Sequence, residues 1–141
     1  MFTRILVAFD GSPGSRRALR AAIQLAQEHG AELWTISVEE HLPRYAATVS
    51  ELNDEREAAN EYFARLLAEA RRLAEEHGLA LQSEVRPGHN AAQTIVAFAR
   101  EIGADLLVLG HSGHSGVWGT FLGTTTDKVS HHAPCSVLIV R

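Results

Sequence analysis

The sequence predicts an α/β fold, a three-layer sandwich in which helices cover both faces of a five-stranded parallel sheet. Short apolar runs alternate with segments of helical spacing, and a helix between two strands carries the chain back for parallel pairing. The run "LLVL" at 106–109 is apolar throughout, as in strands covered on both faces. A length of 141 residues, with 45% hydrophobic and 21% charged residues, predicts one globular domain over 1–141.

The first half of the chain predicts two strands and two helices. The apolar run "ILVAF" at 5–9 ends at the turn-forming residues "DGSP" and indicates a buried strand. Helical spacing follows over 15–29, and "LWTISV" at 33–38 is a β-branched and aromatic strand. Residues 41–49 have no period and are expected to form a loop, whereas about 50–77 repeat apolar residues at three- and four-residue steps, which predicts a long amphipathic helix.

The second half continues the alternation of strands and helices. "LQSEV" at 81–85 predicts a third strand, and Asn90 can cap the helix that follows it. The apolar strand at 106–109 is followed by a glycine-rich loop, a short helix over about 124–132 and a last strand at 136–140. Two sheet orders are compatible with this alternation, 2-1-3-4-5 and 3-2-1-4-5, and periodicity does not choose between them.

Composition argues against nucleic-acid and membrane partners. The formal net charge is −4, and acidic and basic residues are interspersed over 65–76, so no basic surface for nucleic acid is expected. The longest apolar runs are far shorter than the roughly 20 residues of a membrane span. Residues 1–10 lack a secretory leader, and the lone Cys135 cannot form an internal disulfide, so we expect a cytoplasmic protein.

The segment "GHSGHSGVWGTFLGTTTDK" at 110–128 is the strongest candidate for a ligand site. Its glycines let backbone N–H groups approach a ligand, and Thr124, Thr125 and Thr126 stand where a helix begins, as in phosphate sites. A structural role is equally compatible, because Thr124 and Asp127 match a helix-capping pattern. Its length favours a function. It is not a Walker A motif, because no lysine follows Gly123, and "DGSPG" is not a dinucleotide fingerprint.

Several segments together carry a resemblance to a known family. They are "ILVAFDGS" at the first strand, "GADLLVLG" before the loop, the spacing Gly110-x2-Gly113-x9-Gly123-Thr124, and "HAPCSVLIVR" at the end. Over essentially the whole chain this combination closely resembles the universal stress protein family of the ATP-binding kind. The resemblance implies an adenine nucleotide alpha hydrolase-like sheet of order 3-2-1-4-5, homodimers, and an adenine nucleotide across the ends of strands 1, 2 and 4.

The resemblance also implies candidate site residues. Ala8, Phe9 and Asp10 correspond to the first-strand contact with the nucleoside, and Val38 to the second-strand position near the base. The phosphate and ribose segment corresponds to Leu109, Gly110, Gly113, Gly123, Thr124, Thr125 and Thr126. The family often has an arginine directly after the first loop glycine, where this chain has His111, with His114 three residues further on. Because imidazole titrates near neutral pH, this departure predicts weaker or pH-dependent affinity.

We therefore expect a nucleotide-responsive stress or signalling protein that binds ATP, or ADP or AMP, with Mg²⁺ or Mn²⁺ carried in by the phosphates. No catalytic residue is assigned, because the loop offers no Lys or Arg to stabilise charge at the γ-phosphate, and slow ATP hydrolysis stays an alternative. The strand at 136–140 is expected to form a sheet edge that pairs with a second copy as a homodimer.

Other functions are also compatible with the predicted fold. An oligomeric stress protein that binds no nucleotide is the main one, although such family members tend to lose the glycine-threonine segment. An ATP-using ligase of related fold is disfavoured, because "DGSPGS" lacks its signature in the first strand-to-helix turn, and a flavin carrier is suggested by fold alone. A dedicated transition-metal site at the histidine pairs is disfavoured, because no cysteine stands at ligand-like spacing from them.

Overall fold

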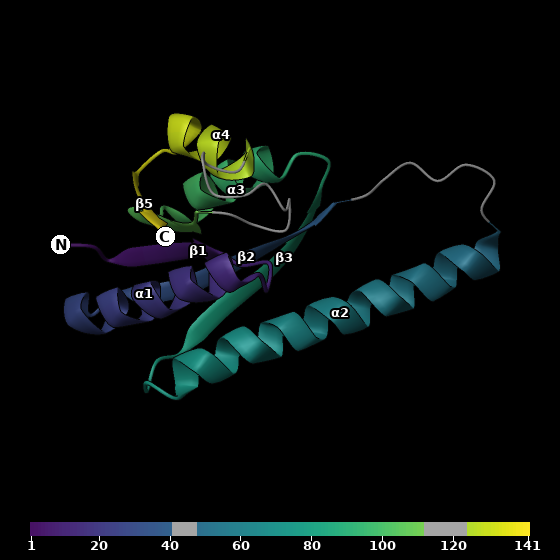
Figure 1. Cartoon of the computed structure of the whole chain (residues 1–141), viewed down its shortest axis with the longest axis horizontal. Coiled ribbons are helices and arrows are strands. Elements are labelled where there is room, and N and C mark those ends of the chain that lie inside the picture. Colours follow the sequence, from purple (N-terminus) through teal and green to yellow (C-terminus); the bar gives the residue numbers. More distant parts are fainter. Residues whose placement is uncertain (41–47, 112–123) are drawn as a thin grey trace.

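The computed structural model describes residues 1–40, 48–111 and 124–141. Within these ranges, five parallel strands form one sheet in the order β3-β2-β1-β4-β5 (Figure 1). This order confirms the predicted fold class and the arrangement 3-2-1-4-5. The elements are, in chain order, β1 (Arg4–Ala8), α1 (Pro13–His29), β2 (Glu32–Glu40), α2 (Val49–Glu75), β3 (Leu81–Gly88), α3 (Ala91–Ile102), β4 (Leu106–Gly110), α4 (Thr124–His132) and β5 (Ser136–Val140).

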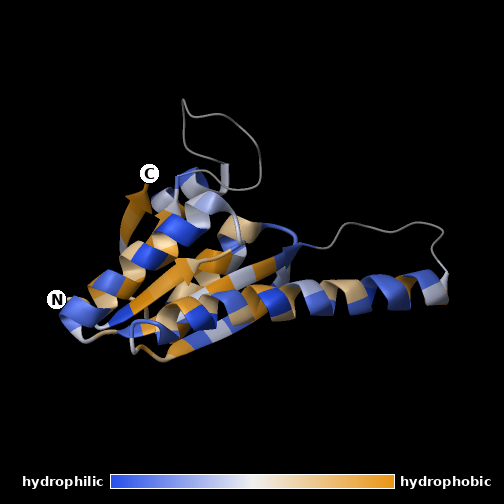
Figure 2. Ribbon diagram, turned by 60° about the horizontal axis from the view of Figure 1, so that its bottom comes forward, coloured by the Kyte–Doolittle hydropathy of each residue, from blue (hydrophilic) through white to orange (hydrophobic). Residues whose placement is uncertain are grey.

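Helices cover both faces of the sheet, with α1 and α2 on one face and α3 and α4 on the other (Figure 1). Successive side chains of β1 serve the two layers in turn, because strand side chains alternate between faces. Ile5 and Val7 pack in the core under α1 and α2, whereas Leu6 packs in the core under α3 and α4. The apolar strands stand out between the mixed colours of the helices in Figure 2.

The long helix α2 begins earlier than the sequence pattern suggests. Thr48 caps it: the Thr48 hydroxyl accepts from the Glu51 N–H at 3.1 Å, and the Glu51 carboxylate accepts from the Thr48 N–H at 3.3 Å. This capping box satisfies two backbone donors at the helix start. The expectation of a loop as far as Val49 is therefore wrong at its end, because Val49 is the first helical residue.

The start of α2 extends past the sheet (Figure 2). Val49 and Leu52 are exposed there, whereas Leu66 and Ala70 are buried in the core. Within the described ranges, no helix combines the length and hydropathy that a membrane span requires.

The two outer strands of the sheet differ in chemistry. β3 carries Glu84, Arg86 and Pro87, and its pairing with β2 runs to Glu40 opposite Gly88, beyond the apolar part of either strand. β5 has the sequence "SVLIV", and the side chain of Leu138 is exposed. Charged side chains and proline discourage further strand pairing, so the β3 edge is protected and the β5 edge is not.

Polar contacts close the edge of the sheet at which the strands begin. The Asp105 carboxylate accepts from the N–H groups of Thr3 at 2.8 Å and Arg4 at 2.9 Å, and from the Thr3 hydroxyl at 3.0 Å. Arg4 donates to the Ile102 carbonyl at 2.6 Å and to Glu32 at 2.5 Å. Burial by itself raises the pKa of Asp105, but the hydrogen bonds from the Arg4 and Thr3 backbone and the Thr3 hydroxyl outweigh it and leave the pKa below its ordinary value.

Candidate functional site

The candidate site lies at the opposite edge, where β1, β2 and β4 end. β1 stands between β2 and β4, and the chain leaves β1 for α1 on one face, whereas α3 and α4 lie on the other face. In open α/β sheets the crevice at such a switch point is the usual place for a ligand. A cavity of about 550 Å³ occupies it, within the range of small-molecule sites.

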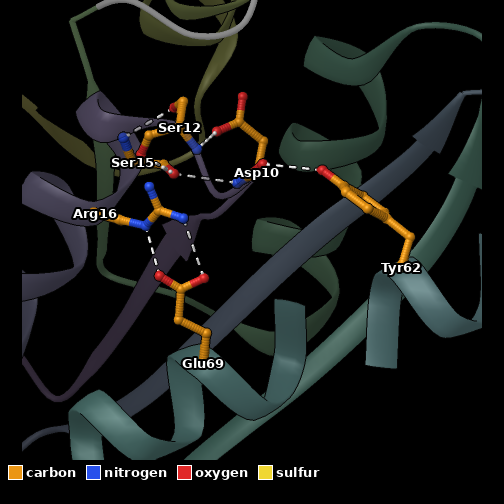
Figure 3. A network of polar contacts seen from close by, with 6 residues as sticks. All are labelled: Asp10, Ser12, Ser15, Arg16, Tyr62 and Glu69. Atoms are coloured by element: carbon orange, nitrogen blue, oxygen red, sulfur yellow. Dashed lines mark hydrogen bonds and ion pairs between the residues drawn. The ribbon is translucent and has the colours of Figure 1, made fainter. Parts of the chain in front are cut away.

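A hydrogen-bonded turn leads from β1 into α1. Asp10 accepts from the Ser12 N–H at 2.9 Å, and Gly11 adopts a φ of 78°, which favours glycine. Ser12 caps α1 by accepting from the Ser15 N–H at 3.2 Å, and the Ser15 hydroxyl donates back to the Ser12 carbonyl at 3.0 Å (Figure 3). Pro13 occupies the first helical position, which needs no N–H donor. The turn is therefore fixed before any ligand arrives.

β4 reaches this turn through a close backbone contact. A Cβ atom at Gly110 would lie 2.6 Å from the carbonyl carbon of Gly14 and 2.7 Å from its oxygen, so only glycine fits. The Thr126 hydroxyl donates to the Gly110 carbonyl at 3.0 Å and ties the first turn of α4 to the end of β4. The His111 N–H donates to the Val140 carbonyl at 2.8 Å and ties β4 to β5. Gly110 thus has a packing role of its own.

The end of β2 offers backbone groups to the cavity. The Ile36 carbonyl accepts from the Phe9 N–H at 2.9 Å, so Ile36 directs its backbone groups toward β1. Because successive residues of a strand direct their backbone groups to opposite neighbours, Val38, two residues after Ile36, directs its N–H and C=O to the β1 side, beyond Ala8, the last β1 residue paired with β2. The Ser37 hydroxyl donates to the Phe9 carbonyl at 2.7 Å and holds the two strand ends together.

Helix α2 supplies a wall that crosses the β1–α1 turn. The Tyr62 hydroxyl donates to the Asp10 carbonyl at 3.3 Å, and the Arg16 guanidinium donates to both Glu69 oxygens, at 2.5 and 3.3 Å (Figure 3). Leu66 lies between these contacts, so close to Gly11 that an added Cβ there would be 2.7 Å from its Cδ1 atom. The hydrogen bond to Glu69 raises the pKa of Arg16.

The cavity wall is mainly apolar, with serines and threonines and the carboxylates Asp10 and Glu40. Among the described residues that line it, none is Lys or Arg, so the permanent charges there are negative. The lining consists of Ala8, Phe9, Asp10, Ser12, Ser15, Ile36, Ser37, Val38, Glu40, Tyr62, Phe63, Leu66, Ala91, Ile95, Leu109, Gly110, Thr124, Thr125 and Thr126.

The structure brings most of the sequence-predicted residues together. Three predicted residues, Gly113, His114 and Gly123, lie outside the described ranges. His111 follows Gly110 directly but is not among the described lining residues. The predicted residues that line the cavity are Ala8, Phe9, Asp10, Val38, Leu109, Gly110, Thr124, Thr125 and Thr126.

Sequence reasoning missed the contribution of α2 and α3. Tyr62, Phe63 and Leu66 come from α2, and Ala91 and Ile95 from the first turns of α3. The apolar spacing of both helices assigns most of these residues to a buried face, but periodicity does not tell which end of that face stops at a cavity. Tyr62 carries no such signal, because it stands beside the apolar stripe.

Comparisons with known proteins agree with this architecture. A sequence profile described as the universal stress protein family matches residues 1–141. A universal stress protein of Thermus aquaticus is 37% identical over 144 residues, which span 100% of each chain. The solved structure of the universal stress protein UspA from Lactobacillus plantarum is 27% identical, covers 99% of this chain and 97% of its own, and superposes with a TM-score of 0.86.

A second solved structure, a universal stress protein in complex with cAMP, is 29% identical to this chain. The match covers 99% of this chain and 97% of the other, with a TM-score of 0.76. The profile match over the full length, the relative at 37% identity and the agreement in fold point to one assignment. The chain belongs to the universal stress protein family.

Proposed function

We propose that this protein binds an adenine nucleotide, ATP or else ADP or AMP, in the cavity at the ends of β1, β2 and β4, and acts as a nucleotide-responsive stress or signalling protein. The observation that carries the proposal is the cavity itself, which lies at the switch point of the sheet and is lined by residues that the glycine-threonine segment and the family resemblance singled out. The family relative in complex with cAMP supports an adenine nucleotide as the ligand class.

The chemistry of the lining suggests how the ligand would lie. The apolar residues Ile36, Val38, Ala91 and Ile95 suit a flat base, and the backbone groups of Val38 suit its polar edge. The phosphates would lie on the β4 side, near the start of α4 at Thr124, Thr125 and Thr126, because a helix N-terminus carries unsatisfied N–H donors and a partial positive charge. Asp10 would then face the ribose, away from the phosphates.

A divalent cation fits this site only as a partner of the phosphates. Within the described ranges, no cluster of three or more metal-ligating side chains is present, so the phosphates would supply most of the ligands. The carboxylates of Asp10 and Glu40 repel a bare triphosphate. We infer that ATP binds together with Mg²⁺ or Mn²⁺, which would neutralise phosphate charge. AMP, with less charge, should depend on the cation much less.

We propose binding rather than fast catalysis. The sequence between Gly110 and Asp127 contains no Lys or Arg, and phosphoryl transfer relies on such cations at the γ-phosphate. Slow ATP hydrolysis is the alternative, and release of inorganic phosphate from purified protein with ATP and Mg²⁺ tests it. A rate above that of the Ala91→Trp variant described next would favour the alternative.

A matched pair of substitutions on α3 tests the proposed site. Ala91 lines the cavity, whereas Ala97 is exposed on the same helix, outside the lining. Ala91→Trp should fill the base end and lower the affinity for AMP at least tenfold, while Ala97→Trp leaves it unchanged, as measured by isothermal titration calorimetry. Circular dichroism checks that both variants fold.

Nucleotide retained during purification offers an independent test. Protein purified without added nucleotide is denatured by heat, and the supernatant is analysed by mass spectrometry for adenine compounds. No adenine compound in the supernatant, together with no thermal shift in millimolar ATP and Mg²⁺, would favour the alternative function, an oligomeric stress protein that binds no nucleotide. An adenine compound present in wild type and depleted in Ala91→Trp would support the proposal.

We also propose a homodimer through β5. The strand forms an edge of the sheet, and its apolar residues Val137, Leu138 and Ile139 are only partly buried by this chain. Antiparallel pairing of two copies would satisfy the outer backbone groups and cover Leu138. Sedimentation equilibrium should give twice the chain mass for wild type and a monomer for Leu138→Lys. A wild-type monomer at micromolar concentration would contradict the dimer.

A further inference from the structure

We propose that Tyr62 forms an aromatic wall of the nucleobase pocket and helps to select a flat heterocyclic ligand. This inference rests on the proposed function and adds to it a residue that no sequence motif identifies. Tyr62 lines the cavity, and 43% of its surface is exposed. A large, partly exposed aromatic ring at the rim of a cavity is a common feature of ligand sites.

Two contacts fix the orientation of the Tyr62 ring. Its hydroxyl donates to the Asp10 carbonyl at 3.3 Å, and its ring meets Phe63 edge-on, with centroids 5.1 Å apart and an interplanar angle of 81°. Figure 3 shows the side chain reaching from α2 toward Asp10. A ring that is already held in place loses little conformational freedom when a ligand packs against it.

The helix that carries Tyr62 is itself docked on the β1–α1 turn. Tyr62, Leu66 and Glu69 stand at helical spacing on one face of α2, and each meets a residue of the segment 10–16. Tyr62 is therefore placed by a rigid element and by three successive contacts. A site built on such an element holds its geometry better than one built on a loop.

The position of α2 places Tyr62 at the base end of the cavity. α2 packs over β3 and against α1, so it reaches the cavity from the β2 side. Gly110 and Thr124 lie on the β4 side, where phosphates are expected. On the other face of the sheet, Ala91 and Ile95 of α3 line the same cavity. The cavity thus offers an aromatic ring on one face and aliphatic side chains on the other, which suits a planar, uncharged base.

The test separates the ring of Tyr62 from its hydroxyl and from its bulk. Tyr62→Phe keeps the ring and loses the hydrogen bond to Asp10, whereas Tyr62→Leu keeps apolar bulk and loses the aromatic face. Leu52→Ala serves as the control, because Leu52 is exposed on α2 outside the cavity lining. The affinity of each purified full-length variant for AMP is measured by isothermal titration calorimetry, and its thermal midpoint is measured without ligand.

We expect Tyr62→Leu to weaken AMP binding about three- to tenfold, the usual strength of an aromatic contact, and Tyr62→Phe and Leu52→Ala to change it less than twofold. The midpoint without ligand should stay close to wild type in all three. Equal affinity of Tyr62→Leu and wild type, or an equal loss in Tyr62→Phe and Tyr62→Leu, would overturn the role of the ring while leaving the proposed function intact. Absence of AMP binding by wild type would overturn both.

Discussion

The two edges of the sheet are completed in opposite ways. At the edge where the strands begin, the chain satisfies its own polar groups: Asp105 accepts from Thr3 and Arg4, and Arg4 reaches Glu32. At the edge where the strands end, apolar side chains together with serines, threonines and two carboxylates line a cavity of about 550 Å³. One edge therefore stabilises the fold, and the other is rigid yet open. Both edges belong to the same five parallel strands. The position of the ligand site therefore follows from what lies at each end of the strands.

The largest effect on this contrast is expected from Gly110→Ala. The added Cβ would meet the backbone of Gly14 at 2.6 Å, and a backbone neighbour cannot move aside as a flexible side chain can. We expect a loss of about 2–3 kcal/mol in the free energy of unfolding, measured by urea denaturation.

Gly30→Ala is the control for Gly110→Ala. Gly30 ends α1 at a φ of 63°, and nothing lies within 4 Å of an added Cβ. The substitution should therefore lower the free energy of unfolding by only about 1 kcal/mol, because alanine disfavours the left-handed backbone. An equal loss in the two variants would show that the close contact between β4 and α1 is unimportant.

Asp105→Asn should weaken the closed edge and leave the open edge unchanged. An amide cannot accept from all the donors that face Asp105, so we expect a loss of about 1–3 kcal/mol in the free energy of unfolding at pH 7. The affinity for AMP should not change. A loss of affinity as large as the loss of stability would contradict the independence of the two edges.

The same substitution has a signature in pH. Because the folded-state pKa of Asp105 is lowered, its stabilisation is fully present above the unfolded pKa of about 3.9 and is lost as the pH falls through the lower folded value. Urea denaturation of wild type from about pH 5 to about pH 2, a range that includes the ordinary carboxyl pKa, should show this loss of stability. In Asp105→Asn this part of the acid sensitivity should be missing.

The sequence predicts some features of the fold better than others. The apolar runs identify all five strands, but the order 3-2-1-4-5 came from family resemblance, since periodicity says nothing about which strands pair. β2 and β3 are longer than their apolar cores, because their backbones go on pairing as far as Glu40 and Gly88 regardless of side-chain character. The start of α2 is marked in the sequence by the capping residues Thr48 and Glu51, but a helical period of apolar residues does not include a cap.

The candidate site was predictable at the strand ends and at the start of α4, and not where its residues come from α2 and α3. Asp10 and Leu109 stand at strand ends, which meet at one edge in any parallel sheet. Tyr62 reaches the cavity only because α2 crosses the β1–α1 turn, a fact of tertiary packing. The sequence assigns Gly110 to the ligand-binding segment, and nothing in the local pattern indicates that its close neighbour is Gly14, far away in the sequence. Contacts of this kind leave no local pattern.

A smaller effect is expected at the link between α1 and α2. The Arg16–Glu69 pair is partly exposed, with side-chain exposures of 39% and 25%, so Glu69→Gln should lower the free energy of unfolding only slightly. The loss of stability should be smaller at about 1 M salt, because charges are strongly screened at that ionic strength. A salt-independent loss would assign the effect to packing of α2 on the turn.

The smallest expected effect concerns Cys135, near the closed edge. Burial raises the pKa of this thiol, and the charge of Asp105 raises it further. Wild-type protein should therefore react with a disulfide reagent more slowly than free cysteine does at pH 8.5, near the ordinary thiol pKa. Asp105→Asn should speed the reaction slightly. A reaction as fast as that of free cysteine would contradict the burial.

The unequal borders of the sheet also limit how copies of this chain can assemble. Proline and paired charges on β3 discourage any strand from joining there, while β5 presents an apolar border. If copies pair strand to strand, they pair through β5 of each copy. The one unprotected edge strand of both copies is then used. Growth then stops at two copies, and a continuous ribbon, the usual hazard of an exposed strand, has no second border from which to extend.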